Sequence, residues 1–268
     1  MRILMVSDVY FPRINGVSTA INTYRRTLIA EGIDVRLVAP DYDNGCHEDW
    51  IRRVPSRPVP LDPEDRIMQW KALLEAVEEE ATHCDAIHVQ TPFLAHYAAV
   101  RIAHQLNQPL VGTYHTLFEE YFQHYIPLLP SSWLKGIARR VSRKQCNDMD
   151  RVIVPSRAIE TRLRDYGVTS KVQILPTGIP LNQFNSGNGQ RFREQYGIPE
   201  ERPVALFVGR VAHEKNIGFL LESIAIARQQ VPNILLIITG EGPALSYLKQ
   251  QVNKLDLRAF SDRAWWNH

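Results

Sequence analysis

The chain has 268 residues, of which 44% are hydrophobic and 22% are charged, and its formal net charge is +2 at pH 7. This composition is that of an ordinary soluble globular protein and excludes the disordered and fibrous classes. The net charge is too small to indicate nucleic-acid binding, so we expect no nucleic-acid partner.

Cysteine usage and the amino-terminal segment indicate the compartment. The three cysteines, Cys46, Cys84 and Cys146, are far apart and form no Cys-x-x-Cys pair. This usage is typical of a reducing compartment and argues against a disulfide framework or a structural zinc site. The first apolar run is interrupted at Asp8, too early for a signal peptide, and no run is long enough to span a bilayer. We therefore expect a cytoplasmic protein, peripheral at the inner face of the cell membrane where it meets lipid.

Short apolar runs alternate with longer helical patterns from the amino terminus to about residue 176. The runs rich in Val, Ile and Leu are predicted strands, at residues 2–7, 34–40, 85–90, 109–115, 151–156 and 171–176. The helical patterns between them lie near residues 18–31, 64–81, 93–107, 131–148 and 157–166. Because the strands are continuously apolar, both faces of their sheet should be buried, as in parallel sheets. The alternation predicts an α/β fold with a Rossmann-like, doubly wound parallel sheet.

Residues 176–190 are rich in Pro, Gly and Asn and are predicted to form a linker. After them come predicted strands at 204–208 and 233–238 and predicted helices at 216–230 and 243–254. Two strands and two helices cannot bury both faces of a parallel sheet, so this second Rossmann-like unit is expected to be incomplete. We place the first domain at residues 1–180 and the second at residues 181–268.

Two cations follow the predicted strand at 204–208, in the stretch "VALFVGRVAHEKN". Arg210 leaves the carboxyl end of the strand, and Lys215 lies in the loop before the next helix. Ligands of open α/β sheets bind outside the carboxyl ends of strands, and helix N-termini attract anions. The pair is therefore predicted to hold a diphosphate and to stabilise it as a leaving group. The alternative is that both residues are solvated loop charges.

Two further loops follow predicted strands. Asn15-Gly16 precedes a predicted helix. Glycine permits a ligand to approach the backbone closely, and the free N–H groups at the start of the helix can bind an anion or a sugar hydroxyl. An ordinary strand-to-helix turn is the alternative. His115 also lies at a strand's carboxyl end, which favours substrate contact over the structural role that is usual for a lone histidine. A metal site of His115, Glu119 and His124 has no standard ligand spacing, so we expect no metal.

The predicted helix at 131–148 carries apolar residues on one stripe and cations elsewhere. The aromatic residue and the cations are Trp133, Lys135, Arg139, Arg140, Arg143 and Lys144. Tryptophan on one face with Lys and Arg on the other is typical of a helix that lies on anionic lipid. A packed helix with a solvated basic face is the alternative.

Together these segments resemble the family 4 retaining glycosyltransferases, which have the GT-B architecture of two Rossmann-like domains. The matching motifs, in chain order, are "NGVSTAI", "VQTPF", "TYHT", "VIVPSRAIETRL", "LPTGIPLNQF", "VGRVAHEKNIGFLLESI" and "TGEGPALSYLKQ". The stretch "TYHTLFEEY" and the basic helix are most similar to members that glycosylate lipids, namely diacylglycerol glucosyltransferases and phosphatidylinositol mannosyltransferases.

The resemblance implies transfer of a hexose from a UDP- or GDP-linked sugar to a lipid-type or sugar acceptor, with retained configuration and without a metal or other cofactor. It implies that the first domain binds the acceptor and the second binds the donor. Arg210 and Lys215 would hold the donor's diphosphate, and Gly16 would line the loop near the donor phosphate and the acceptor. His115 would be catalytic, in contact with a hydroxyl of the transferred sugar.

The sequence departs from the family's pattern late in the second domain. The family has two glutamates there, separated by seven residues, but the last glutamate of this chain is Glu241. Glu214 and Glu222 have that spacing but lie at the start of the domain's first helix. The tail "RAFSDRAWWNH" also loses the pattern, so we expect a truncated and impaired enzyme. The alternatives are an inactive fragment that binds only acceptor or membrane, and another nucleotide-sugar enzyme such as a 2-epimerase.

Overall fold

The computed structural model describes residues 1–42, 48–59, 62–115, 131–179 and 181–257, with residues 62–64, 131–135 and 182–183 described by their backbone alone. The chain divides into two compact units, Met1–Leu181 and Asn182–His268. Among the described helices, none combines the length and the apolar character needed to cross a membrane.

The first unit is built on a seven-stranded sheet with the strand order β3-β2-β1-β6-β7-β8-β9. Its strands are β1 (Arg2–Val6), β2 (Asp34–Pro40), β3 (Ile51–Val54), β6 (Ala86–Val89), β7 (Leu110–Thr113), β8 (Arg151–Val154) and β9 (Lys171–Ile174). Every pair of neighbours in this sheet is parallel. The predicted doubly wound parallel sheet is confirmed, and each strand predicted from an apolar run in this unit belongs to it.

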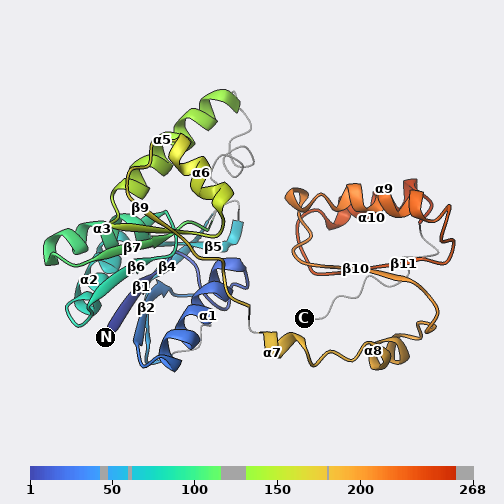
Figure 1. The fold of residues 1–268 in the computed structure, drawn as a ribbon, viewed down its shortest axis with the longest axis horizontal. Helices are drawn as coiled ribbons and strands as arrows, with labels where there is room; N and C mark the ends of the chain where they lie inside the picture. The colour runs from blue at the N-terminus through green and yellow to red at the C-terminus, as the bar shows by residue number, and fades with distance from the viewer. Residues whose placement is uncertain (43–47, 60–61, 116–130, 180, 258–268) are drawn as a thin grey trace. The chain divides into compact units, whose positions relative to one another are not determined.

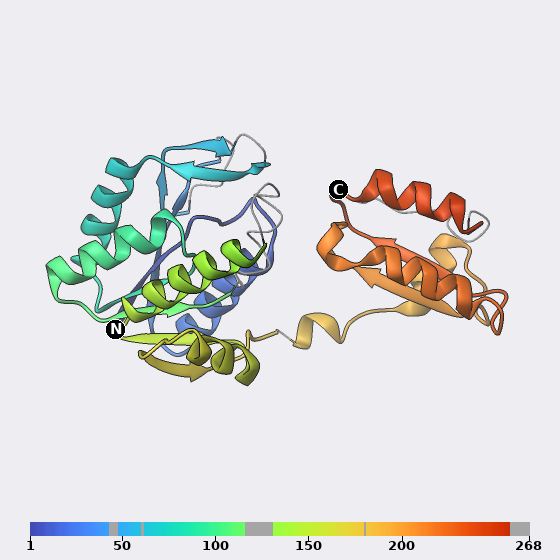
Figure 2. The same ribbon diagram turned by 90° about the horizontal axis from the view of Figure 1, so that it is seen from above.

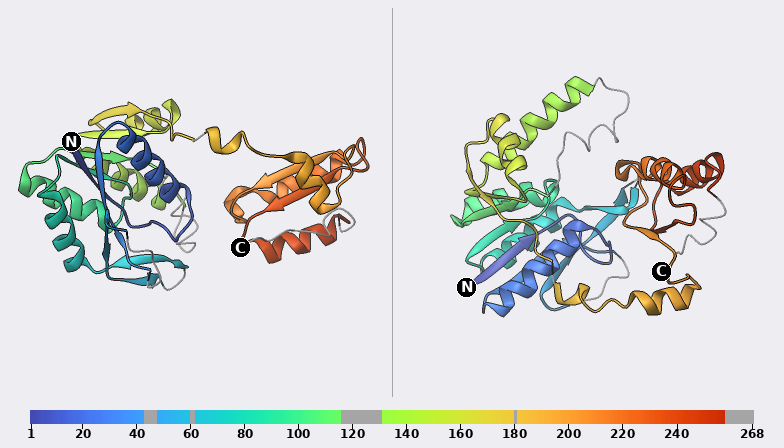
Figure 3. Two further views of the ribbon diagram at one scale, coloured as in Figure 1. Left: turned by 90° about the horizontal axis from the view of Figure 1, so that it is seen from below. Right: turned by 45° about the vertical axis from the view of Figure 1, so that its right-hand side comes forward.

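Helices cover both faces of this sheet (Figure 1). They are α1 (Gly16–Ala30), α2 (Trp70–Ala81), α3 (Leu94–Leu106), α5 (Ser131–Asn147) and α6 (Arg157–Asp165). Helix α1 packs on the face that carries Met5, whereas α2 and α3 pack on the face that carries Leu4. Successive side chains of a strand point to opposite faces, so these two neighbours belong to different cores. Helices α5 and α6 lie side by side and share a third core with β8 (Figure 3).

Polar side chains define where several helices begin and end. The side chain of Asn15 accepts a hydrogen bond from the N–H of Ser18 at 2.9 Å and caps the start of α1. Ser156 caps α6 in the same way, with the N–H of Ile159 as its donor. Helix α3 ends at Asn107, whose left-handed backbone (φ 51°) stops the helix. Each cap lies next to a strand-to-helix or helix-to-strand connection of the predicted alternation.

An antiparallel pair, β4 (Ser56–Val59) and β5 (Asp62–Met68), forms a separate small sheet (Figure 2). The helix predicted near residues 64–81 is wrong in its first part, because β5 continues to Met68 and α2 begins at Trp70. The sequence predicts neither β3 nor β4, because each has four residues and one or two of them are arginines.

The second unit contains a parallel pair of strands covered on one face by two helices (Figure 1). The strands are β10 (Val204–Val208) and β11 (Leu235–Thr239), and the helices are α9 (Ile217–Ala227) and α10 (Leu245–Lys254). A 3-10 turn, η1 (His213–Lys215), precedes α9. The predicted strands and helices of this unit are present. The predicted linker, residues 176–190, contains the boundary between the two units; α7 (Leu181–Phe184) lies inside it and α8 (Gly189–Tyr196) begins at its end.

Candidate functional site

The sheet of the first unit reverses its winding between β1 and β6. These strands are neighbours in the sheet, although β2 to β5 separate them in the sequence. The chain leaves β1 toward β2 on one side and leaves β6 toward β7 on the other. Where winding reverses in this way, the loops diverge and a crevice opens outside the carboxyl ends of the strands. The loops after β1, β6 and β7 therefore form the candidate site of this unit.

Asp8 lies two residues beyond β1 and joins two of these loops. Its carboxylate accepts hydrogen bonds from the Thr91 hydroxyl at 2.7 Å and from the Ala95 N–H at 3.1 Å. It caps the N-terminus of α3, for which Phe93 offers no side-chain cap. Burial raises the pKa of Asp8 to about 6, against the opposing effect of Thr91 and of the N–H groups of Ala95, Phe93 and Leu94. Asp8 is not among the residues predicted from the sequence, because its partner Thr91 lies 83 residues away in the chain.

Gly16 is the first residue of α1, at the far end of the loop that leaves β1. A Cβ added at Gly16 would meet no heavy atom of the described structure within 4 Å. Local packing therefore does not require a glycine at this position. The first N–H groups of a helix have no partners within the helix, so the position offers donors and open space. Contact between Gly16 and a ligand stays a prediction.

His115 lies just beyond β7, beside Gln90, which lies just beyond β6. His115 Nε2 and Gln90 Oε1 are 3.0 Å apart. One step lower on the same two strands, His88 Nε2 and the Thr113 hydroxyl are 2.8 Å apart. Because β6 and β7 are parallel and side chains alternate between faces, the two pairs lie on one face, one above the other. We call these four residues the polar ladder.

Both histidines of the polar ladder are neutral at neutral pH. Burial lowers the pKa of His115 to about 4. Burial, together with the nearby His115, lowers the pKa of His88 to about 3. Helix α1 covers this face of the sheet, and the rings of Tyr24 and His88 are 5.8 Å apart. A neutral imidazole donates through one nitrogen and accepts through the other, so His115 is suited to hydrogen bonding rather than to carrying charge.

In the second unit, a glycine lets two backbone segments approach closely beyond β10 and β11. The N–H of Gly209 donates to the Thr239 carbonyl at 2.9 Å, and the N–H of Val211 donates to the Glu241 carbonyl at 2.7 Å. Gly240 has a φ of 140°, and a Cβ there would lie 1.9 Å from the Gly209 carbonyl oxygen. Only glycine fits such an approach. The loop after β10 is thereby held against the loop after β11.

Arg210 lies between the two hydrogen-bonded residues of this loop and is exposed. Since side chains alternate along a strand, Arg210 continues the face of Leu206 and Val208, which are 61% and 70% exposed. Lys215 is exposed at the end of η1, and Asn216, with a left-handed backbone (φ 49°), separates it from α9. The structure thus places both predicted cations in one loop at the carboxyl end of β10. Gly16 and His115 belong to the first unit.

The predicted basic surface lies on α5, whose side chains are described from residue 136 onward. The side chains of Trp133 and Lys135 lie outside that range. The remaining predicted residues are all exposed, namely Arg139, Arg140, Arg143 and Lys144. The guanidinium of Arg139 lies 5.6 Å from the centre of the Tyr166 ring, and Lys144 forms an ion pair of 3.0 Å with Asp148. Binding of this surface to lipid stays a prediction.

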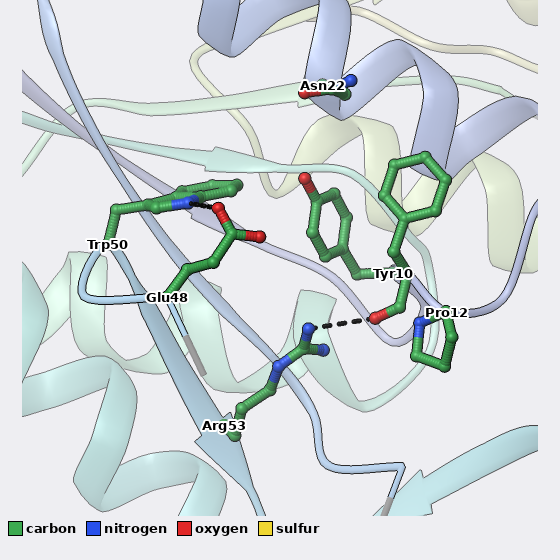
Figure 4. A pocket seen from close by; sticks show the side chains of 7 residues that line it. Tyr10, Pro12, Asn22, Glu48, Trp50 and Arg53 are labelled. Carbon is green, nitrogen blue, oxygen red and sulfur yellow. Dashed lines mark hydrogen bonds between the residues drawn. The ribbon is translucent and has the colours of Figure 1, made fainter. Parts of the chain in front are cut away.

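A pocket of about 280 Å³ opens beside α1 and the loop after β1 (Figure 4). It is lined by Tyr10, Phe11, Pro12, Asn22, Glu48, Trp50 and Arg53. The guanidinium of Arg53 donates to the carbonyls of Phe11 and Pro40 at 3.0 Å each, and Glu48 accepts the indole N–H of Trp50 at 2.6 Å. The charged groups of the pocket thus already have structural partners. The sequence does not predict this pocket, because its lining comes from three separate segments.

Among the described residues, no group of three or more His, Cys, Asp or Glu side chains is arranged to hold a metal ion. The metal site considered for His115 lies partly outside the described residues, because Glu119 and His124 are not among them. The expected lack of a metal cofactor therefore stays a prediction.

Comparisons with known proteins agree with one another. The sequence profile of Glycosyltransferase Family 4 matches residues 14–183, and that of Glycosyl transferases group 1 matches residues 188–260. An alpha-monoglucosyldiacylglycerol synthase of Streptococcus pneumoniae is 33% identical over 96% of this chain and 60% of its own length. A GDP-mannose-dependent alpha-mannosyltransferase of Corynebacterium glutamicum is 28% identical over 94% of this chain and 60% of its own length.

A solved structure gives the same fold. The sucrose-phosphate synthase from Thermosynechococcus elongatus matches with a TM-score of 0.71 at 22% identity, covering 99% of this chain and 70% of that one. The expected GT-B fold class is confirmed. The chain spans 60% of the length of the two curated relatives described above.

Proposed function

This chain belongs to the family 4 glycosyltransferases, and on that premise we propose that it transfers a hexose from a UDP- or GDP-linked sugar to a lipid-type acceptor. The relatives named for glucosyldiacylglycerol synthesis and for GDP-mannose-dependent transfer support the two substrate classes. The first unit binds the acceptor, and the second binds the donor. The reaction proceeds with retained configuration at the cytoplasmic face of the membrane, and no metal takes part.

The pair of exposed cations beyond β10 is the observation that carries this proposal. Breaking the bond between the sugar and the diphosphate builds negative charge on the leaving group. A guanidinium and an ammonium positioned beforehand stabilise that charge without reorganisation at the moment of reaction. Arg210 lies between Gly209 and Val211, whose N–H groups donate to the carbonyls of Thr239 and Glu241, and these two bonds limit its backbone movement. Lys215 supplies the second charge from the same loop.

Two residues of the first unit have proposed roles of their own. His115 stays neutral at physiological pH because burial lowers its pKa to about 4, so it contacts a sugar hydroxyl by hydrogen bonding. Gly16 leaves open space at the N-terminus of α1, and the N-terminus of a helix suits a phosphate oxygen or a hydroxyl. Together they give the acceptor side of the reaction a neutral, hydrogen-bonding environment.

The basic surface of α5 supports a membrane-bound acceptor. Its described cations are exposed, and Ile137, which precedes them on the helix, is 48% exposed. A surface of this composition gains electrostatic attraction from anionic lipid and contact with its acyl region. The protein thus works as a peripheral membrane protein that reaches an acceptor embedded in the bilayer.

The experiment is the release of nucleoside diphosphate from UDP-glucose or GDP-mannose by the purified chain, with vesicles that contain diacylglycerol and an anionic lipid. Release should depend on the vesicles. Arg210→Ala should lower kcat/KM by a factor that corresponds to about 2–4 kcal/mol, as for loss of a charge partner in the transition state. Lys249→Ala, which removes an exposed cation from α10, is the matched control and should change little. A loss of less than about tenfold for Arg210→Ala would refute the role of the cation pair.

The same assay separates the alternatives. If the chain binds the vesicles but releases nucleoside diphosphate from neither donor, it is a binding-only fragment and not a transferase. If it consumes a nucleotide-sugar equally fast without vesicles, an enzyme such as a 2-epimerase is the better description.

A further inference from the structure

Gln90 differs from the other polar residues of the crevice in how deeply it is buried. Only 1% of its surface is exposed, and its Nε2 has no hydrogen-bond partner among the described residues. A buried donor without a partner costs about 1–3 kcal/mol. An apolar side chain would fill the same space without that cost. The cost suggests that Gln90 is present for the contact that its side chain does make, the 3.0 Å hydrogen bond between its Oε1 and His115 Nε2.

We propose that Gln90 is a positioning residue, whose side-chain oxygen holds His115 in the Nε2–H tautomer and leaves the Nδ1 lone pair to accept a hydrogen bond from a hydroxyl of the transferred sugar. The identity of the hydroxyl-bearing ligand rests on the proposed function. The assignment of the His115 tautomer by Gln90 rests on the geometry of their hydrogen bond alone.

The chemistry follows from what each atom can do. A side-chain carbonyl oxygen only accepts hydrogen bonds, so the Nε2 that faces Gln90 must carry the hydrogen. Nδ1 is then unprotonated and only accepts, and a sugar hydroxyl is a suitable donor. Burial keeps the ring of His115 neutral, with a pKa of about 4, so its tautomer decides what it recognises. A fixed partner on one nitrogen selects the tautomer in the same way as the buried aspartate of serine proteases does.

The sheet gives this contact a rigid base. The N–H of Gln90 donates to the Val6 carbonyl at 2.9 Å, so β1 holds its backbone from one side. On the other side, the bond between His88 and Thr113 joins β6 to β7 one step lower on the same face. Gln90 and His115 lie one and two residues beyond these strands, and the N–H of Tyr114 donates to the Ile153 carbonyl of β8 at 2.8 Å. Residues anchored in this way by paired strands hold their geometry better than residues far out on loops, so the sheet fixes the backbone on both sides of the contact.

The first test reads the His115 ring by ¹⁵N NMR in the full chain, with the resonances assigned by their loss in His115→Asn. The wild type should show the Nε2–H tautomer. Gln90→Leu should give a mixture of tautomers. Gln90→Glu should raise the pH at which His115 titrates by about two units, because a carboxylate stabilises the imidazolium. His88, the other titrating group of the polar ladder, should stay neutral throughout.

Gln108→Leu is the matched control. The amide of Gln108 donates to the carbonyls of Ala81 and Cys84 at 2.7 Å each and precedes β7. Its loss disturbs the fold without touching His115, so the ring should be as in the wild type. An Nδ1–H tautomer in the wild type, or no change of the ring in Gln90→Leu, would overturn the proposal. If the leucine variant does not fold, the titration in Gln90→Glu decides alone.

The second test is kinetic. Gln90→Leu should lower kcat by about tenfold or more with the acceptor KM nearly unchanged. A misoriented His115 ring weakens a contact that stabilises mainly the transition state. Gln90→Glu should add a rise of activity with pH that the wild type lacks, as His115 loses its proton. A KM effect without a kcat effect would overturn the role in positioning. The NMR measurement does not depend on turnover. If the chain shows no transfer activity, the proposed function is refuted, but the NMR result still decides whether Gln90 fixes the tautomer of His115.

Discussion

Replacement of Asp8 by asparagine removes a partly buried charge and keeps the shape of the side chain. Burial raises the pKa of Asp8 from 3.8, the value of an exposed aspartate, to about 6 in the folded protein. One pKa unit is equivalent to about 1.4 kcal/mol. The ionised carboxylate therefore costs the folded state about 3 kcal/mol relative to the unfolded chain at neutral pH.

The direction of the pH dependence follows from proton binding. Between about pH 4 and pH 6, the folded protein binds more protons at Asp8 than the unfolded chain does, so its free energy of unfolding falls as the pH rises. Below this range both states are protonated, and above it both are ionised, so the contribution is constant. Asparagine does not titrate. Asp8→Asn should therefore match the wild type near pH 4 and exceed it by about 3 kcal/mol at pH 7.

The assay is urea unfolding at a series of pH values, combined with amide hydrogen exchange of Ala95 at the start of α3. Both proteins share all other titrating groups, so their difference isolates Asp8. Asp165→Asn, at an exposed position of α6, is the matched control for the loss of one carboxylate. Parallel pH profiles for Asp8→Asn and the wild type would refute the assignment of a buried, ionisable cap.

In the second unit, Gly240→Ala should lower the free energy of unfolding by about 3 kcal/mol, because its Cβ would lie 1.9 Å from a backbone oxygen. Urea unfolding checks this, and Gly187→Ala, with no atom within 4 Å of the new Cβ, should be nearly neutral. In the first unit, Glu80→Gln should cost about 1 kcal/mol at neutral pH, since its carboxylate accepts two bonds from Arg36 at 2.8 and 2.9 Å. Arg36 lowers the pKa of Glu80, so this difference should vanish as the pH falls through that pKa; equal stability of the two proteins at pH 7 would contradict it.

The sheet of the first unit was predictable because its strands are marked locally. In β1 the run "RILMV" is buried at its last three residues, and only a strand covered on both faces needs such continuous apolar character. The pair β4 and β5 carries no such mark, since β5 reads "DPEDRIM". Among the described side chains of the two strands only Met68 is buried, so the pair depends mainly on mutual hydrogen bonding, and that pairing is not visible in either segment alone.

Candidate site residues were predictable where a strand end alone defines them. His115 and Arg210 follow apolar runs, so the rule for strand carboxyl ends was enough to select them. Asp8 and Gln90 needed knowledge of which strands are neighbours. The partner of Asp8, Thr91, is 83 residues away, and no local pattern states that β6 lies beside β1. Contacts across the point where the winding reverses become visible only when the strand order is known.

The polar ladder makes the length of β7 more important than most of its residues. Thr113 faces His88, and His115 faces Gln90, only in the present register of β6 and β7, since successive side chains alternate between faces. Deletion of one residue within β7 would turn both toward the α3 side. Tyr114, whose hydroxyl now lies 3.1 Å from that of Ser142 on α5, would turn toward Gln90 instead. Substitutions in this strand change one contact at a time, whereas an insertion or deletion exchanges its two faces, so relatives with this site should vary in residue here but not in length.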